Sequence, residues 1–241
     1  MILAILQARA TSTRLPGKVL KDLCGAPMIV RQIERVRRAR RVDRLVLATS
    51  TDASDDPLAA VAAGAGVDVH RGPLDDVLAR FIGALDAFGP AEHVVRLTGD
   101  CPLIDSTLID AVIERVVAQG ADYGCVDTPP DHRSFPKGLD AEAMRAETLR
   151  AAAARASTSW EHEHVTPGIY GHPERYRLTF VNQAADEGDV RWTVDFPHDY
   201  AFVAAVYEAL YPANPAFTSD DIRAFVGSRP DLARLGGERR V

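Results

Sequence analysis

The chain has few cysteines, and no stretch of it is long and apolar enough to cross a membrane. Cys24, Cys101 and Cys125 are an odd number of cysteines without C-x-x-C spacing, which argues against a disulfide framework and against a structural zinc site. A membrane-spanning helix needs about 18 or more consecutive apolar residues, so we expect no membrane partner. The sequence enters an apolar run at residue 2 without a basic leader, so we expect no secretory signal and a cytoplasmic location.

Acidic residues outnumber basic ones. The formal net charge is -6, whereas a surface that binds the phosphate backbone of nucleic acid is usually basic. We therefore expect a small-molecule ligand and no nucleic-acid partner. One dense group of cations is predicted to be the solvated face of a helix, with an anion or partner patch as the alternative. It consists of Arg35, Arg37, Arg38, Arg40 and Arg41.

Apolar runs and amphipathic stretches alternate through the first half of the chain. This βαβ pattern predicts an α/β fold, with a mainly parallel central sheet and helices on both faces. The predicted strands are residues 2–6, 45–48, 67–69 and 94–97, and the predicted helices are residues 26–39, 56–65, 75–88 and 105–118. Ligands of such sheets bind at the carboxyl ends of the strands, so we expect the functional residues there.

The alternation stops at about Pro129. We predict a single domain over residues 1–241, with an inserted lobe at residues 129–190. The stretch VRWTVDFPHD then predicts a strand that ends in a carboxylate, followed by helices at 198–210 and 219–227 and a loose tail.

The loop QARATSTRLPGK, residues 7–18, follows the first predicted strand. It combines Arg9, Arg14 and Lys18 with small and hydroxyl residues, a composition that suits an anion such as a phosphate. It matches neither the Walker A motif nor the dinucleotide fingerprint. Lysine is otherwise limited to Lys21 and Lys137, which favours a specific role for Lys18 over the alternative of a surface loop with incidental cations.

Two aspartates follow predicted strands. Asp100 comes after residues 94–97, and Asp195 ends the strand predicted within VRWTVDFPHD. Both are expected at the same sheet edge as the cationic loop, where two carboxylates can share Mg²⁺ with triphosphate oxygens. Helix capping or simple surface exposure is the alternative for each. Asp199 is predicted to be structural, because a carboxylate suits the first turn of a helix.

The sequence resembles the sugar nucleotidyltransferases of the acylneuraminate and Kdo cytidylyltransferase type, and within them the spore coat polysaccharide biosynthesis branch. The motifs that carry the resemblance are ILQARATSTRLPGK with GAPMI, ATSTDASDDPL, RGPLDDVLARF, RLTGDCPLID, FPKGLDAE, EHVTP and RWTVDFPHD. The resemblance implies a Rossmann-like, GT-A-like nucleotidyltransferase fold, CTP as substrate, Mg²⁺ as cofactor and a homodimer built partly from the inserted lobe.

Roles for individual residues follow from this resemblance. The metal ligands are expected to be Asp100 and Asp195, and the catalytic residues are these two with Arg14 and Lys18, which face the departing pyrophosphate. The nucleotide is expected to contact Gln7, Ala8, Arg9, Ser12, Arg14, Lys18, Ser50, Arg71, Asp75 and Asp76. The acceptor is expected to contact Phe135, Lys137, Asp140, Glu163, His164, Thr166 and Arg191.

Two histidines, two tryptophans and one arginine have other predicted roles. His162 and His164 flank Glu163, but side chains two residues apart on a helix point to different sides, so a zinc site is disfavoured. Trp160 and Trp192 are predicted to be packing residues, and Arg191 could pair with an acidic acceptor or with a neighbouring carboxylate.

The expected activity is transfer of CMP from CTP to an anionic sugar, sugar acid or sugar or polyol phosphate. Catalysis would rest on positioning and charge neutralisation, without a nucleophilic Ser or Cys. One alternative is a glycosyltransferase, disfavoured because Asp100 is followed by Cys101-Pro102 in place of the Asp-x-Asp motif. The other is a nucleotide-binding module without catalysis.

Overall fold

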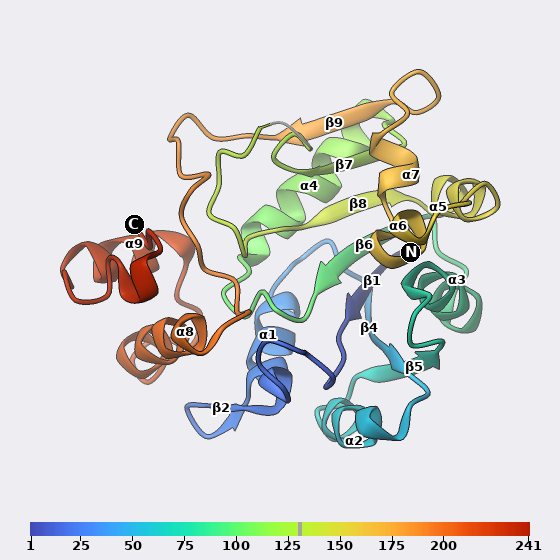
Figure 1. Ribbon diagram of the computed structural model, residues 1–241. Helices are drawn as coiled ribbons and strands as arrows, with labels where there is room; N and C mark the ends of the chain where they lie inside the picture. Colours follow the sequence, from blue (N-terminus) through green and yellow to red (C-terminus); the bar gives the residue numbers. More distant parts are fainter. Residues whose placement is uncertain (130–131) are drawn as a thin grey trace.

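A mostly parallel sheet forms the centre of the molecule (Figure 1). The computed structural model describes residues 1–129 and 132–241. Within these ranges the sheet has seven strands in the order β5-β4-β1-β6-β8-β7-β9, and β2 and β3 form a separate hairpin. The strands β5, β4, β1 and β6 are parallel neighbours, and β8 runs antiparallel to β6 and to β7. The strands are β1 (Ile2–Gln7), β2 (Asp22–Leu23), β3 (Ala26–Pro27), β4 (Arg44–Ser50), β5 (Asp68–Gly72), β6 (His93–Thr98), β7 (Tyr123–Val126), β8 (Glu142–Arg145) and β9 (Leu178–Val181).

Helices cover both faces of the sheet, because both faces of its strands are apolar. In β1, Ala4 and Leu6 belong to one buried cluster and Leu3 and Ile5 to the other, as the alternation of side chains along a strand requires. The first cluster is covered by α1 (Met28–Val36), α2 (Asp56–Gly64), α4 (Ser106–Gln119), α8 (Pro197–Leu210) and α9 (Ser219–Gly227). The second is covered by α3 (Val77–Phe88), α5 (Ala146–Ala153) and α7 (Pro167–Tyr170), and the short α6 (Ser159–His164) lies beside α3. The three short 3-10 turns are Lys18–Leu20, Ala53–Asp55 and Leu235–Gly237.

The predicted fold class is confirmed, but three local predictions are wrong. Residues 190–195 do not form a strand: Arg191 makes one isolated parallel bridge to Lys137. The tail is not loose, since Arg240 is fully buried. Arg35 is not on a solvated face either, because its guanidinium is buried and donates from Nε to the carbonyl of Ile104 at 2.7 Å.

Residues 129–190 contribute β8 and β9 to the central sheet, together with α5, α6 and α7 beside it. Pro130 and Asp131, at the start of the predicted lobe, lie outside the described residues. A role of this segment in dimerisation stays a prediction. None of the helices described is both long and apolar enough to span a membrane.

Candidate functional site

The cationic loop of residues 7–18, the first long loop of the chain, is called the opening loop below. A large cavity lies where the opening loop meets the carboxyl ends of the central strands. Its volume is about 1110 Å³, slightly above the usual range of about 300–1000 Å³ for substrate and cofactor pockets. The predicted nucleotide and metal residues that line it are Gln7, Ala8, Arg9, Ser12, Arg14, Lys18, Asp75, Asp76, Asp100 and Asp195. The structure thus brings most of the predicted nucleotide site together from segments nearly 190 residues apart.

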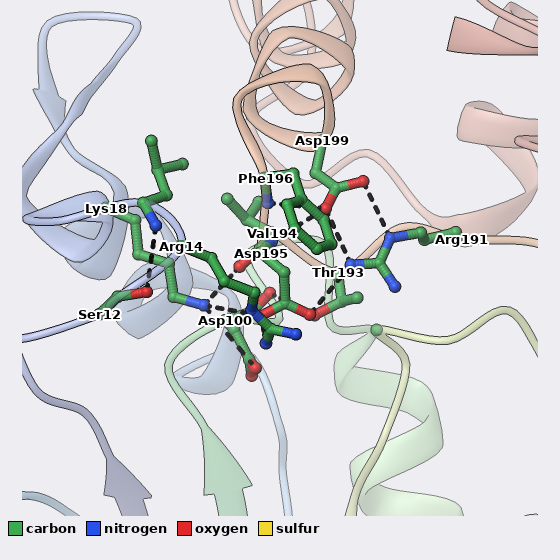
Figure 2. A network of polar contacts seen from close by, with 12 residues as sticks. Ser12, Arg14, Lys18, Asp100, Arg191, Thr193, Val194, Asp195, Phe196 and Asp199 are labelled. Carbon is green, nitrogen blue, oxygen red and sulfur yellow. Dashed lines mark hydrogen bonds and ion pairs between the residues drawn. The ribbon is translucent and has the colours of Figure 1, made fainter. Parts of the chain in front are cut away.

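Lys18 connects the opening loop to both aspartates (Figure 2). Its buried Nζ donates to the carbonyl of Val194 at 2.5 Å and to Oδ1 of Asp195 at 3.1 Å. The same Nζ lies 4.0 Å from Oδ2 of Asp100. The lysine is therefore a point charge held between the two carboxylates, which explains the use of a compact ammonium in a chain that otherwise relies on arginine.

Asp195 is surrounded by cations. Besides Lys18, Arg14 lies 2.7 Å from its Oδ1 and Arg191 lies 2.9 Å from its Oδ2. Burial raises the pKa of Asp195, but these three cations, Lys18 foremost, outweigh it, so that the pKa is lowered. Asp195 is thus a fixed negative charge, and of the two expected roles for Arg191 the structure shows the pairing with neighbouring carboxylates.

Backbone hydrogen bonds place the Asp195 segment against Asp100. The amide of Val194 and the hydroxyl of Thr193 both donate to the carbonyl of Asp100, at 2.8 and 3.0 Å. Upstream, the amide of Trp192 donates to the carbonyl of Lys137 at 2.7 Å. Gly138 allows this contact: its φ is +113°, and a β carbon there would lie 2.6 Å from the amide nitrogen of Thr193. The FPKG motif therefore positions Asp195 through its backbone.

Asp199 supports the same segment from behind. Its Oδ2 accepts the amides of Asp195 and Phe196 at 3.0 Å, and its carboxylate pairs with Arg191 and Arg240. Burial raises the pKa of Asp199, but the hydrogen bonds from Arg191 and the two amides outweigh it and lower the pKa. The buried Arg240 explains why the end of the chain is fixed.

The lowered pKa of Asp199 makes this support dependent on pH. The unfolded carboxyl has a pKa of about 3.9, so the stabilisation is fully present above that value and is lost as pH falls toward the lower pKa of the folded state. We expect Asp199→Asn to destabilise the protein at pH 7 by about 3 kcal/mol, as for a broken buried ion pair, and the difference from wild type to shrink between pH 4 and pH 3. Melting temperatures across this range test it, and a difference that is constant with pH would contradict it.

The acidic pair suits a hard divalent cation. Asp100 and Asp195 supply only oxygen donors and line the cavity next to the cationic loop, which is the chemistry that Mg²⁺ prefers, with phosphate oxygens completing its shell. Within residues 1–129 and 132–241, no group of three or more His, Cys, Asp or Glu side chains could hold a metal ion by itself. A metal held by Asp100 and Asp195 would take its remaining ligands from water or from phosphate oxygens.

Ser50 and Arg71, two of the residues predicted to contact the nucleotide, are engaged with other parts of the protein. The Ser50 hydroxyl is buried and donates to Asp55. Arg71 donates to the carbonyls of Ser50 and Asp52 and pairs with Asp56 at 2.6 Å. Neither lines the cavity as the structure describes it. Asp55 was missed by the sequence analysis: it also accepts the amide of Ala10 at 2.7 Å and so anchors the opening loop.

Asp76 and α6 form the opposite wall of the large cavity. One carboxylate oxygen of Asp76 accepts the amide of Ala79 at the start of α3, and the other lies 2.9 Å from Nδ1 of His162. His162, Glu163 and His164 all line the cavity. Val165, the next residue, has a φ of +70°, which is strained for a β-branched side chain and fixes the end of α6 at the cavity.

A second, smaller cavity of about 250 Å³ adjoins the first. Arg96 and His164 line both. Of the predicted acceptor residues, Asp140, Thr166 and His164 line the second cavity and Glu163 lines the first, whereas Phe135, Lys137 and Arg191 line neither. The side chain of Lys137 is exposed, and its backbone is hydrogen-bonded to Val190 and Trp192.

The tryptophan predictions differ in outcome. Trp192 is fully buried, as predicted, but Trp160 is 58% exposed. Its ring lies 3.7 Å from that of His164, centroid to centroid, and it lines the second cavity. Trp160 is therefore an exposed aromatic surface beside a cavity and not a packing residue.

Several charged residues of the cavities were missed in the sequence. Arg96 occurs inside the apolar run VVRLT, and Arg80 lies on the buried stripe of α3 with Val77, Phe81 and Ala84. In both cases an arginine occupies a position that the apolar pattern of the sequence assigns to the core, and this could have marked the residue as functional. Arg96 pairs with Glu142, whose other oxygen accepts the Tyr123 hydroxyl at 2.9 Å.

A mostly parallel sheet with a cationic loop and two carboxylates near the carboxyl ends of its central strands is the arrangement expected of a nucleotidyltransferase. Comparison with known sequences specifies the type. The chain belongs to the cytidylyltransferase family, because the family's sequence profile matches residues 3–209.

The chain is also similar to individual proteins and to a solved structure of this kind. The chain is 34% identical over 239 residues to the spore coat polysaccharide biosynthesis protein SpsF of Bacillus subtilis, covering 96% of each protein. It is 29% identical over 202 residues to the 3-deoxy-manno-octulosonate cytidylyltransferase of Yersinia pseudotuberculosis, covering 77% of this chain and 80% of the relative. Its fold is similar to a solved cytidylyltransferase from Leptospira borgpetersenii, with a TM-score of 0.89 and 26% identity over 96% of this chain and 95% of the other. The resemblance seen in the motifs is confirmed.

Proposed function

We propose that the protein transfers CMP from CTP to an anionic sugar, sugar acid or sugar or polyol phosphate, releasing pyrophosphate, as a step in the synthesis of a surface polysaccharide. The proposal depends on one observation: the cationic loop and the acidic pair, Asp100 and Asp195, line the same cavity, and a second cavity adjoins it. The first cavity has room for a nucleoside triphosphate, and the second, at about 250 Å³, suits a monosaccharide. The similarity to SpsF supports the polysaccharide pathway, and the free thiols Cys24, Cys101 and Cys125 are compatible with a cytoplasmic location.

The reaction forms a bond between an acceptor oxygen and the α-phosphorus of CTP and breaks the bond from that phosphorus to the oxygen of the departing pyrophosphate. We assign Arg9, Ser12, Arg14 and Lys18 to the triphosphate, because all four line the cavity from one loop. Lys18 and Arg14 lie closest to the acidic pair and are placed to neutralise the charge that develops on pyrophosphate. This chemistry needs no protein nucleophile, and burial raises the pKa of the Cys101 thiol beside Asp100.

Mg²⁺ would be held by Asp100 and Asp195. When bound, it supplies Lewis-acid polarisation of the phosphate oxygens. The protein's own contribution is the position of the two carboxylates, set by the hydrogen bonds from Thr193 and Val194 to the carbonyl of Asp100.

The acceptor is assigned to the second cavity. Arg96 and His164 lie at its junction with the first cavity, where a carboxylate or phosphate of the acceptor would meet the guanidinium of Arg96, which also pairs with Glu142. Trp160 offers an apolar ring beside the same space, a surface on which a sugar ring can lie. We also propose that residues 129–190 contribute to a homodimer, which light scattering tests directly.

Pyrophosphate release tests the function. The full-length protein with CTP, Mg²⁺ and a panel of sugar acids, sugar phosphates and polyol phosphates is expected to release pyrophosphate with at least one anionic acceptor and not with the matched neutral sugars. Release of a free nucleoside diphosphate from a nucleotide sugar would support the glycosyltransferase instead. Tight CTP binding without turnover on any acceptor would favour the non-catalytic module.

A further inference from the structure

Arg240 is fully buried and lines neither of the two cavities. Its Nη2 donates to Oδ1 of Asp199 and to the carbonyl of Leu235, at 2.9 and 3.1 Å. Its Nη1 donates to the carbonyl of Arg191 at 2.7 Å. A buried charge is costly unless it is paired and hydrogen-bonded. Two of these three contacts go to the residues that flank Asp195, so we looked for an effect of Arg240 on that carboxylate.

The contacts of Arg240 converge on the side chain of Arg191. Asp199, the carboxylate that Arg240 holds, accepts from Arg191 through both oxygens: Nε lies 2.9 Å from Oδ1, and Nη2 lies 2.9 Å from Oδ2. The same Nη2 donates to Oδ2 of Asp195 at 2.9 Å (Figure 2). The result is one series of alternating charges that ends at the acidic pair: Arg240, Asp199, Arg191 and Asp195.

The backbone around Arg240 holds the same segment. The amide of Arg191 donates to the carbonyl of Arg239 at 2.8 Å, and Nε1 of Trp192 donates to the carbonyl of Arg240 at 2.7 Å. These anchoring residues lie beyond the stretch that the family profile matches, residues 3–209. The match to the family therefore assigns no role to Arg240.

The carboxylate of Asp195 needs support from its neighbours. Rotation about the last side-chain bond of an aspartate is broad, so a carboxylate that holds a metal ion is oriented by further hydrogen bonds. Oδ1 of Asp195 contacts Lys18 and Arg14 of the opening loop, whereas Oδ2 contacts Arg191. A shift of Arg191 would therefore release one of the two oxygens and let the carboxylate rotate.

We propose that Arg240 is a positioning residue for catalysis, which acts on Asp195 from outside the cavities. It fixes Arg191 through Asp199, and Arg191 in turn orients the carboxylate that would hold Mg²⁺. This inference rests on the proposed function. Because the triphosphate is assigned to the opening loop, loss of Arg240 should weaken the contribution of the metal and slow turnover, while the affinity for CTP without metal changes little.

The first measurement is the factor by which Mn²⁺ raises the affinity for CTP, obtained by calorimetry with Mn²⁺ or with a chelator and without an acceptor. Mn²⁺ stands in for Mg²⁺ because both prefer oxygen ligands in octahedral geometry. In Arg240→Met this factor is expected to fall about tenfold, the scale for partners that orient metal ligands. Affinity for CTP with the chelator should stay within about twofold of wild type.

Turnover gives the second measurement, with an acceptor found by the screen. In Arg240→Met, kcat should fall about tenfold at a temperature where thermal unfolding shows the variant folded. Arg240→Lys should recover only part of the loss, because one ammonium does not reproduce the contacts that two guanidinium nitrogens make.

Two control variants separate this effect from a loss of stability. Arg239→Met removes the neighbouring arginine, whose side chain pairs with Asp189, but keeps the backbone carbonyl that Arg191 uses. Leu149→Ala creates a cavity in the buried cluster on the other face of the sheet, at a position that lines neither cavity of the site. Both should keep the Mn²⁺ factor within about twofold of wild type.

A double variant keeps the test valid if Arg240→Met does not fold. Arg240→Met with Asp199→Asn removes both charges of the buried pair and leaves neither of them unpaired. If Arg240 acts through Asp199, the double variant should have the same Mn²⁺ factor as Asp199→Asn alone.

The inference is overturned if folded Arg240→Met keeps the wild-type Mn²⁺ factor and kcat, if a control variant loses as much, or if the losses from Arg240→Met and Asp199→Asn multiply in the double variant. It is also overturned if wild type binds CTP but Mn²⁺ does not raise the affinity. If wild type does not bind CTP at all, the proposed function fails and the inference fails with it.

Discussion

Asp100→Asn is expected to lower kcat by about a hundredfold or more while leaving the melting temperature close to that of wild type. A hundredfold corresponds to about 2.7 kcal/mol of lost transition-state stabilisation, the scale expected when a ligand of a catalytic metal loses its charge. The side chain is 34% exposed, and its nearest cation is Lys18 at 4.0 Å. The backbone carbonyl of Asp100, and not its carboxylate, accepts the hydrogen bonds that organise the neighbouring segment.

Asp195→Asn should behave differently, although the two aspartates are expected to share one role. Asp195 is buried among Lys18, Arg14 and Arg191, so its loss leaves three cations without their common partner. We expect both a loss of activity and destabilisation of about 3 kcal/mol, which for a chain of this size lowers the melting temperature by about 6–12 °C.

The measurements are pyrophosphate-release kinetics at saturating Mg²⁺, with an acceptor found by the screen, together with thermal unfolding. Asp86→Asn is the matched control, because Asp86 pairs with Arg150 on the surface, away from the cavities. Near-normal turnover in Asp100→Asn would remove this residue from the mechanism. Equal melting temperatures for the two variants would contradict the structural role assigned to Asp195.

The sequence predicted the parts of the fold that depend on local periodicity. The four predicted helices and four predicted strands of the first half all form, and their bounds differ from the prediction by a few residues at most. The strand expected at residues 190–195 does not form, because this segment is fixed by contacts with distant residues: Lys137, Asp100 and Arg240. Such contacts leave no periodic signal in the sequence.

The candidate site was likewise predictable only where its residues have a local pattern in the sequence. The opening loop and the acidic pair were predictable, since a cationic loop and carboxylates after apolar runs have a local signature. Roles that depend on which way a side chain points were not: Lys137 occurs in a motif but is exposed, and Arg80 looked like part of an ordinary amphipathic helix but faces the cavity. In this chain a sequence motif predicts the region of the site, but the direction of each side chain in the folded structure determines which residues can contact a ligand.

Lys18→Ala is expected to reduce kcat/KM for CTP by about a hundredfold or more, whereas Lys21→Ala should change it by about twofold at most. Lys18 is buried between the acidic pair, where a charge acts in a medium of low dielectric constant and is little screened by salt. Lys21 lies over the ring of Tyr200, with its Nζ 4.9 Å from the ring centroid, a contact that belongs to the surface.

The conservative variant separates charge from shape at this position. Lys18→Arg keeps the positive charge but requires a larger, planar group where Nζ is already in contact with Val194 and Asp195, so we expect it to recover less than a tenth of wild-type kcat/KM. Steady-state kinetics of the three variants at low and high salt decide the matter. Because Lys18 is buried, its effect should persist at high salt. If Lys18→Ala and Lys21→Ala had equal effects that both faded with salt, the loop would act only through the general charge of the surface, and the assignment of Lys18 to the departing pyrophosphate would be wrong.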